Sequence, residues 1–197
     1  MRLLRSQESS SASSRLYTSG STGEPKGVMV SHRNCRVFTD WAAGTFALTA
    51  ADRVANQAPF HFDLSTFDLF ATARAGASLH PVSPRLASFP AAVAARLAAD
   101  RLSVWYCTPS SLVLMLTRGG LERLDLAGLR VLLFAGKVFP GKYLRRLMGL
   151  APHARYANLY GPTETNVCTW HELTGPPADG DRLPGKARSG RFSPPVA

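Results

Sequence analysis

Short apolar segments alternate with longer amphipathic segments along most of the chain. Apolar runs of the kind that form buried strands occur at 52–58, 76–82, 103–107, 130–135 and 155–159. Between them, apolar residues recur at helical spacing after Ser31, after Ser88, and over 109–117 and 141–149, and both serines stand in the position of helix N-caps. This alternation predicts an α/β fold in which a parallel or mixed sheet is covered by helices on both faces.

Two further apolar runs, at 15–19 and 27–31, flank a glycine-rich loop and predict strands that hold the two ends of that loop together. Residues 1–15 are rich in serine and follow no periodic pattern, which predicts a disordered leader. Residues 175–197 are dominated by proline, glycine and charged residues, which predicts an irregular tail. The folded domain is therefore expected to span residues 16–174.

Composition narrows the class of protein. The 197 residues suffice for one domain with a hydrophobic core. A net charge of +10 is compatible with nucleic-acid binding, but the basic residues are scattered, which favours a solvated surface or a chain separated from an acidic remainder. The three cysteines lack metal-binding spacing, and no run reaches the ~20 apolar residues that span a membrane. We therefore expect a cytoplasmic protein with free thiols and with no nucleic-acid or membrane partner.

The glycine-rich loop has the chemistry of a polyphosphate site. It runs YTSGSTGEPKG from Tyr17 to Gly27 and combines glycines, hydroxyl side chains and one lysine, Lys26. Glycines allow successive backbone N–H groups to turn toward an anion, and a lysine supplies a point charge for phosphate. The loop is not a Walker A motif, because Pro25 precedes Lys26 and Gly27 follows it.

A second motif, NLYGPTET, follows the last predicted strand and turns sharply at its Gly-Pro pair. Glu164 offers hard oxygen ligands for Mg²⁺ beside a phosphate. Thr163 offers a hydroxyl donor for a phosphate, and Tyr160 offers an aromatic face for a purine. Taken alone, the string is also compatible with an ordinary turn that carries a solvated glutamate.

A third motif, HFDLSTFD, covers residues 61–68 and places Asp63 among aromatic residues. A carboxylate buried there needs a cationic or hydrogen-bonding partner, which a substrate ammonium or imine supplies. Taken alone, the string is also compatible with a helix start capped by Ser65 or Asp63. His61 adjoins this motif, in contact either with a substrate carboxylate or with neighbouring side chains only.

The three strings, in the order in which they occur along the chain, resemble the motifs of the adenylate-forming superfamily, which contains acyl-CoA synthetases, luciferases and adenylation domains of nonribosomal peptide synthetases. The resemblance covers residues 16–173 and implies part of the large N-terminal domain of that fold, with ATP and Mg²⁺ as cofactors. It implies that Thr163 and Glu164 are catalytic, with Glu164 as the metal ligand. The nucleotide-binding residues that it implies are Thr18, Ser19, Gly20, Ser21, Thr22, Gly23, Lys26, Asn158, Tyr160 and Gly161.

The FDxS string at Asp63 resembles the branch of this superfamily that activates amino acids, where this aspartate holds the α-amino group. The amino-acid pocket that the resemblance implies is lined by Asp63, Leu64, Phe67, Tyr106, Leu133, Ala135, Leu159, Val167 and Cys168. After Asp63 the lining is almost wholly apolar, which favours a compact nonpolar amino acid. It resembles ligases that load L-proline onto a carrier protein, with D-alanine ligases and alanine or valine domains as the alternatives.

The implied reaction joins the amino acid to AMP and then transfers it to the phosphopantetheine thiol of a carrier protein. Three features depart from the family pattern. Lys137 stands where the family commonly has an acidic residue, and neither the ribose-binding aspartate motif nor the lysine of the small C-terminal domain is recognisable in this sequence. A truncated, catalytically incompetent fragment with weak nucleotide binding is therefore the alternative function.

Overall fold

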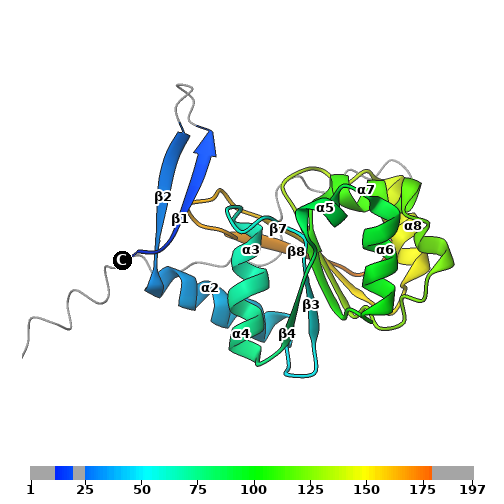
Figure 1. The fold of residues 1–197 in the computed structure, drawn as a ribbon, viewed down its shortest axis with the longest axis horizontal. Coiled ribbons are helices and arrows are strands. Elements are labelled where there is room, and N and C mark those ends of the chain that lie inside the picture. Colours follow the sequence, from blue (N-terminus) through cyan, green and yellow to red (C-terminus); the bar gives the residue numbers. More distant parts are fainter. Residues whose placement is uncertain (1–11, 20–24, 179–197) are drawn as a thin grey trace, which may run out of the picture.

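The computed structural model describes residues 12–19 and 25–178, and side chains from residue 27 onward. The predicted leader up to residue 11, the centre of the glycine-rich loop and the tail from residue 179 lie outside the described residues. The elements form an antiparallel hairpin and a six-stranded sheet flanked by helices (Figure 1).

The six-stranded sheet is mostly parallel. Its order is β4 (Ser78–Pro81), β3 (Arg53–Asn56), β5 (Val104–Cys107), β6 (Val131–Ala135), β7 (Arg155–Tyr160) and β8 (Thr169–Leu173). The first five strands run parallel, and β8 pairs antiparallel with β7. The α/β class is confirmed, but β8 was not anticipated because it directly precedes the proline-rich segment and is only partly buried.

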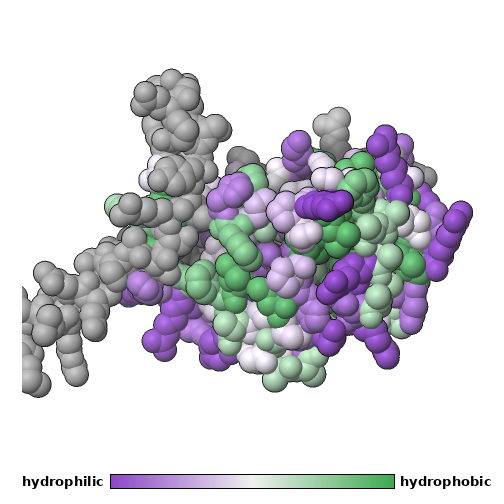
Figure 2. Space-filling view, viewed as in Figure 1, coloured by the Kyte–Doolittle hydropathy of each residue, from purple (hydrophilic) through white to green (hydrophobic). Residues whose placement is uncertain are grey.

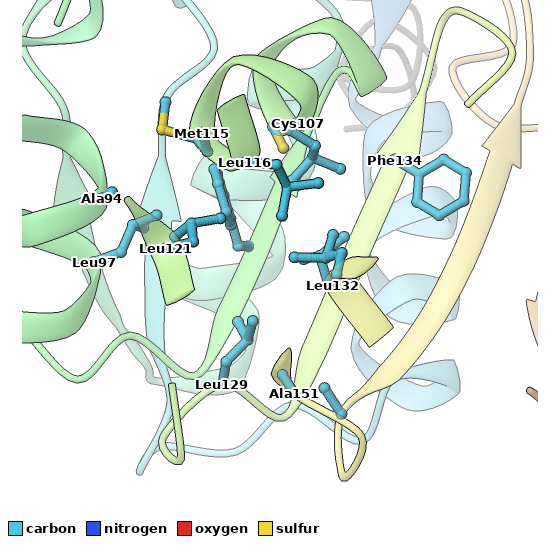
Figure 3. Packing of buried hydrophobic residues seen from close by; sticks show 14 of the residues in the cluster. Ala94, Leu97, Cys107, Met115, Leu116, Leu121, Leu129, Leu132, Phe134 and Ala151 are labelled. Atoms are coloured by element: carbon cyan, nitrogen blue, oxygen red, sulfur yellow. The ribbon is translucent and has the colours of Figure 1, made fainter. Parts of the chain in front are cut away.

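Every residue of β5 and β6 is buried, because helices cover both faces of the sheet. The helices α6 (Pro90–Ala99), α7 (Pro109–Arg118) and α8 (Gly141–Leu150) pack on one face, against side chains such as Leu132 and Phe134 (Figure 3). Helix α2 (His32–Thr45) and the segment from Leu64 to Ala75 cover the other face, against Leu133 and Ala135. The alternation along β6 thus divides the core into two clusters. The short helices α5 (Pro84–Ala87) and η2 (Leu121–Arg123) complete the helix-rich side.

The hairpin consists of β1 (Ala12–Ser19) and β2 (Pro25–Ser31), and it stands apart from the main sheet in Figure 1. The register pairs Thr18 with Lys26 and Ser19 with Pro25, which brings the ends of the glycine-rich loop together as expected. Strand β1 begins at Ala12, so residues 12–15 belong to a strand and not to the predicted leader. A strand forms there because its pairing uses backbone groups, which a serine-rich sequence supplies as well as any other.

Of the two serines predicted to cap helices, one does so in the structure. The hydroxyl of Ser31 accepts the backbone N–H of Asn34 at 3.2 Å and caps α2 as predicted. Ser88 is not a cap, because its hydroxyl donates to the carbonyl of Pro84 and α6 begins two residues later, at Pro90. Proline suits the first position of a helix, since its fixed φ is already helical and no N–H is needed there.

A buried ion pair ties together the amino edge of the sheet. The carboxylate of Asp52, 3% exposed, accepts hydrogen bonds from Arg130 Nε at 2.7 Å, from the Ser103 hydroxyl at 2.7 Å and from the Thr49 amide at 2.8 Å. Arg130 also donates to the carbonyl of Phe46 at the end of α2. Burial by itself raises the pKa of Asp52, but the hydrogen bonds from Arg130, Ser103 and Thr49 outweigh it and lower the pKa to about 2.

Replacement of Asp52 by asparagine leaves the half-buried Arg130 guanidinium without its counter-charge. We expect the free energy of unfolding at pH 7, measured by urea denaturation, to fall by about 3 kcal/mol. The matched control is Arg36→Gln, which breaks an ion pair with Asp40 on an exposed helix surface and is expected to change stability little. Equal stability of the Asp52→Asn variant and the wild type would contradict the role given to this pair.

The ion pair of Asp52 and Arg130 also predicts how the free energy of unfolding depends on pH. The folded pKa of about 2 lies below the value of about 3.9 for an unfolded aspartate, so the stabilisation is fully present above about pH 5. As the pH falls from about 5 toward 2, the free energy of unfolding of the wild type is expected to decrease by about 2 kcal/mol more than that of the Asp52→Asn variant.

Candidate functional site

The carboxyl ends of the parallel strands meet at one edge of the sheet, where ligands of α/β proteins commonly bind. The HFDLSTFD motif lies there, in the segment that follows β3, and the NLYGPTET motif lies there at the end of β7. The two motifs touch: the hydroxyl of Thr163 donates to Asp63 Oδ2 at 3.2 Å. The side-chain amide of Asn166 donates to the backbone carbonyl of Asp63 at 3.3 Å. Residues that are 100 positions apart in sequence thus form one site.

The turn after β7 requires its glycine. A Cβ placed on Gly161 would lie 2.1 Å from the carbonyl oxygen of Asn166, far inside van der Waals contact. Asn166 itself adopts φ +59°, the left-handed region that asparagine tolerates better than most residues. The Cys168 amide then donates to the Tyr160 carbonyl at 2.9 Å and closes the loop. This fold-back brings Thr163 to Asp63.

Asn166 is a site residue that sequence reasoning missed. An asparagine shortly after a Gly-Pro turn is a signal for left-handed backbone. Its contact with residue 63, however, depends on the order of strands in the sheet, which the local sequence does not reveal.

Asp63 begins an irregular helix made of α3 (Leu64–Thr66), the π-helical η1 (Phe67–Ala71) and α4 (Thr72–Ala75). The side chain of Asp63 makes no capping hydrogen bond, and the Ser65 hydroxyl donates to the Phe62 carbonyl at 2.7 Å. Asp63 thus stands at the N-cap position, as the alternative interpretation allowed, but neither side chain caps the helix through a hydrogen bond. The Asp63 carboxylate accepts its side-chain hydrogen bond from Thr163 instead.

Burial raises the pKa of Asp63, although hydrogen bonds from Thr163 and from backbone amides act in the opposite direction. No cationic side chain among the described residues forms an ion pair with Asp63. A ligand ammonium at this position would favour the ionised carboxylate and supply the missing charge.

The structure brings the predicted pocket residues together. Phe67, Tyr106, Leu133, Ala135, Leu159 and Val167 are buried members of one apolar cluster, and Leu64 packs against it. The rings of Phe67 and Tyr106 meet edge to face, with centroids 5.4 Å apart. Cys168 is partly buried, and its thiol contacts the Tyr160 carbonyl at 3.4 Å. These side chains pack closely on one another beneath Asp63.

An open pocket of about 320 Å³ adjoins this cluster and shares Leu64 with it. Its lining is formed by Gln57, Ala58, Pro59, Phe62, Leu64, Ala87, Cys107, Thr108 and Ser111. Of the predicted pocket residues, only Leu64 lines this opening. Sequence reasoning did not anticipate that Cys107 and Thr108, at the end of β5, face it.

The predicted nucleotide residues occupy two places. Asn158, Tyr160 and Gly161 lie at the end of β7, where Tyr160 is 37% exposed and Asn158 is buried. Thr18 and Ser19 end β1, and Lys26 belongs to β2. Gly20, Ser21, Thr22 and Gly23 lie outside the described residues. Lys137 is exposed just beyond β6, after Gly136 with φ +98°.

Glu164 is exposed and forms no hydrogen bond or ion pair with the described residues, so its carboxylate is free to bind a ligand. Across 12–19 and 25–178, no group of three or more His, Cys, Asp or Glu side chains is arranged to hold a metal ion. A divalent ion at Glu164 would therefore take its other ligands from water and from a bound phosphate, as Mg²⁺ commonly does. No helix in the described part of the chain has the length and hydropathy needed to span a membrane. On the face of the molecule that Figure 2 shows, hydrophilic and hydrophobic residues are intermixed.

Curated relatives are carrier-protein ligases. The chain is 46% identical over 158 residues to the L-proline--[L-prolyl-carrier protein] ligase of Pseudomonas fluorescens, covering 80% of this chain and 32% of that protein. It is 40% identical over 152 residues to the D-alanine--D-alanyl carrier protein ligase of Bacillus velezensis, covering 77% of this chain and 30% of the relative. The chain thus spans about a third of the length of these relatives.

Solved structures of adenylation enzymes share the fold. The nonribosomal peptide synthetase FmoA3 with AMPPNP bound superposes with a TM-score of 0.81 at 28% identity, over 91% of this chain and 19% of FmoA3. The Vibrio cholerae adenylation domain AlmE, solved with glycyl-adenosine-5'-phosphate, superposes with a TM-score of 0.77 at 31% identity, over 87% of this chain and 32% of AlmE.

The sequence model of the AMP-binding enzymes matches residues 6–195. This match spans nearly all of the 197 residues and includes all three motifs. The chain therefore belongs to the AMP-binding enzyme family.

Proposed function

We propose that this chain carries the substrate-binding part of a ligase that activates a small nonpolar amino acid, L-proline, with ATP. The product is an aminoacyl-AMP, and the aminoacyl group then passes to the phosphopantetheine thiol of a carrier protein. The observation that carries the proposal is the hydrogen bond between Thr163 and Asp63, because it joins the motif suited to phosphate with the motif suited to an ammonium group.

The proposed reaction needs the amino acid and the α-phosphate side by side. A carboxylate oxygen of the amino acid attacks the α-phosphorus of ATP, the bond from that phosphorus to the β-phosphate oxygen breaks, and pyrophosphate leaves. Asp63 orients the amino acid by holding its ammonium, and the Thr163 hydroxyl holds the α-phosphate. Because the two side chains lie within hydrogen-bond distance of each other, they place the reacting carboxylate and phosphate side by side.

The remaining nucleotide contacts are assigned from the chemistry of the residues. Tyr160, at the exposed end of β7, stacks on the adenine. The loop that begins at Thr18 and ends at Lys26 holds the β- and γ-phosphates, since the hairpin register sets those two residues opposite each other. Glu164 is an exposed carboxylate with no ion pair to any described residue, and it fits a Mg²⁺ ion, which when bound would neutralise negative charge on the phosphates.

The apolar cluster beneath Asp63 supports a nonpolar side chain for the substrate. It offers no second charge to a polar amino acid, since its members are Phe, Tyr, Leu, Ala and Val. The relatives at 46% identity are L-proline ligases and those at 38–40% are D-alanine ligases, so L-proline is the first choice and D-alanine the alternative.

The first test measures amino-acid-dependent exchange of pyrophosphate into ATP by the purified chain. We expect the largest kcat/KM with L-proline, compared with D-alanine, L-alanine and L-valine. Preference for D-alanine would overturn the choice of proline. Absence of exchange with all four amino acids would favour the alternative of a fragment that binds nucleotide weakly.

Asp63→Asn removes the negative charge that holds the ammonium. We expect the KM for the amino acid to rise about 10- to 100-fold while the KM for ATP changes less than twofold, because charge-assisted hydrogen bonds contribute about 1.5–3 kcal/mol. The matched control is Asp40→Asn, which alters a surface aspartate paired with Arg74. In the wild type, the KM for the amino acid should also rise as the pH falls, beginning at a higher pH than for an ordinary aspartate, since the pKa of Asp63 is raised.

Glu164→Gln retains the shape of the side chain but weakens its oxygen as a metal ligand. We expect the Mg²⁺ concentration for half-maximal exchange to increase about tenfold or more, with partial recovery of the rate at high Mg²⁺. Glu122→Gln, which alters a surface glutamate paired with Arg146, is the control and should leave the Mg²⁺ requirement unchanged. An unchanged requirement in the Glu164→Gln variant would remove Glu164 from the metal site.

A further inference from the structure

Asp68 is a buried acid that none of the roles assigned above uses. It lies in the π-helical segment η1, five residues after Asp63, and it is 0% exposed. Its Oδ2 atom accepts one hydrogen bond, from the side-chain amide of Asn56 at the end of β3, at 2.9 Å. Its Oδ1 atom is buried and has no hydrogen-bond partner.

Among the described residues, none places a positive charge beside Asp68. From β5, Tyr106 and Cys107 lie near enough for a negative charge on Asp68 to affect their ionisation, and burial holds the pKa of both groups well above their usual values. Helix α2 also packs against this segment, and its one buried titratable group is the thiol of Cys35. Asp63 is the other acid of the same helix. An ionised carboxylate with one hydrogen bond and no cation is very costly in such a place.

The helix is irregular at the same position. Two other helical threonines, Thr39 and Thr117, donate their hydroxyls to the carbonyl four residues earlier, at 2.7 and 2.8 Å. Thr72, four residues after Asp68, leaves its buried hydroxyl oxygen without a partner. The wide turn at 67–71 displaces the carbonyls from their usual positions, and such π-turns frequently mark functional sites.

We propose that Asp68 is a positioning residue for the amino-acid site: as a neutral acid held by Asn56, it fixes the wide helical turn and, through that turn, the place of Asp63. The inference rests on the proposed function in that Asp63 is the group that binds the amino acid. Asn56 anchors the turn to the end of β3, and the neighbouring Phe67 contacts Tyr106 of β5, so the helix start is held against two strands.

Burial raises the pKa of Asp68 well above its usual range, which agrees with a neutral acid. A group protonated in the folded state and ionised in the unfolded chain lowers stability as the pH rises above about 4. Asparagine has the same shape and accepts the same hydrogen bond without that loss. The acid is therefore a weaker choice than asparagine for stability alone at neutral pH.

The test compares Asp68→Asn with Asp68→Leu, two side chains of similar shape of which only asparagine can accept the hydrogen bond from Asn56. The first readout is the titration of the Asp63 carboxyl followed by carbon NMR on the whole chain, assigned with Asp63→Asn. We expect the raised pKa of Asp63 to persist in the Asp68→Asn variant and to move toward the ordinary value of about 3.9 in the Asp68→Leu variant. An identical titration of Asp63 in both variants would overturn the proposal.

If the Asp68→Leu variant does not fold, Asn56→Ala removes the same hydrogen bond from the strand side, and the same displacement of the Asp63 titration is expected. The second readout is the urea midpoint from pH 4 to 8. The urea midpoint of the wild type should fall progressively below that of the Asp68→Asn variant as the pH rises. A difference that does not change with pH would contradict the claim that Asp68 is protonated in the folded protein.

Kinetics separate this inference from the proposed function. In pyrophosphate exchange, we expect Asp68→Leu to raise the KM for the amino acid at least tenfold and the KM for ATP less than twofold, whereas Asp68→Asn should stay within twofold of the wild type for both. An equal rise of both constants would indicate a general structural role and overturn the proposal. Failure of the wild type to catalyse exchange would count against the proposed function, and the Asp63 titration would still decide the role of Asp68.

Discussion

The burial of the parallel strands on both faces is the constraint on which the rest of the structure depends. Strands β5 and β6 have no exposed residue, so polar chemistry is confined to the edges where the strands begin and end. The amino edge is closed by the pair of Asp52 and Arg130, and the carboxyl edge carries the two described motifs. Polar side chains that serve binding therefore stand mainly near strand ends, and the buried polar groups of the interior, such as Asp68 and Thr72, are exceptions.

The acids of the two edges differ in their surroundings. Asp52 has a guanidinium and further donors from Ser103 and Thr49, and the hydrogen bonds lower its pKa to about 2. Asp63 and Asp68 have no cationic partner among the described residues, and burial raises the pKa of each. The paired acid stabilises the fold, whereas the two unpaired acids cost stability at neutral pH. A partly buried acid without a cationic partner, such as Asp63, is typical of a binding site where a ligand supplies the missing charge, whereas Asp68 accepts its hydrogen bond from Asn56.

The turn after β7 connects the nucleotide motif to the amino-acid motif. It depends on a glycine that leaves room for a carbonyl and on an asparagine that adopts left-handed backbone, and neither residue contributes chemistry to the reaction. Their effect is to direct Thr163 toward Asp63. The specificity of such a site therefore depends on backbone geometry as well as on the groups that touch the ligands.

The sequence by itself determined the fold class, the order of most elements and the identity of the chemical motifs, because apolar periodicity and short polar strings are local properties. It also determined the family. The antiparallel strand β8 and the strand at residues 12–15 escaped it, since each depends on backbone pairing that side-chain patterns do not show. Only the tertiary structure decided that Thr163 and Asn166 reach Asp63, that Asp68 lies buried against Asn56, and that Leu64 adjoins an open pocket. These contacts join residues from different strands and helices, and their distances are fixed by the order and packing of the sheet, which no local stretch of sequence encodes.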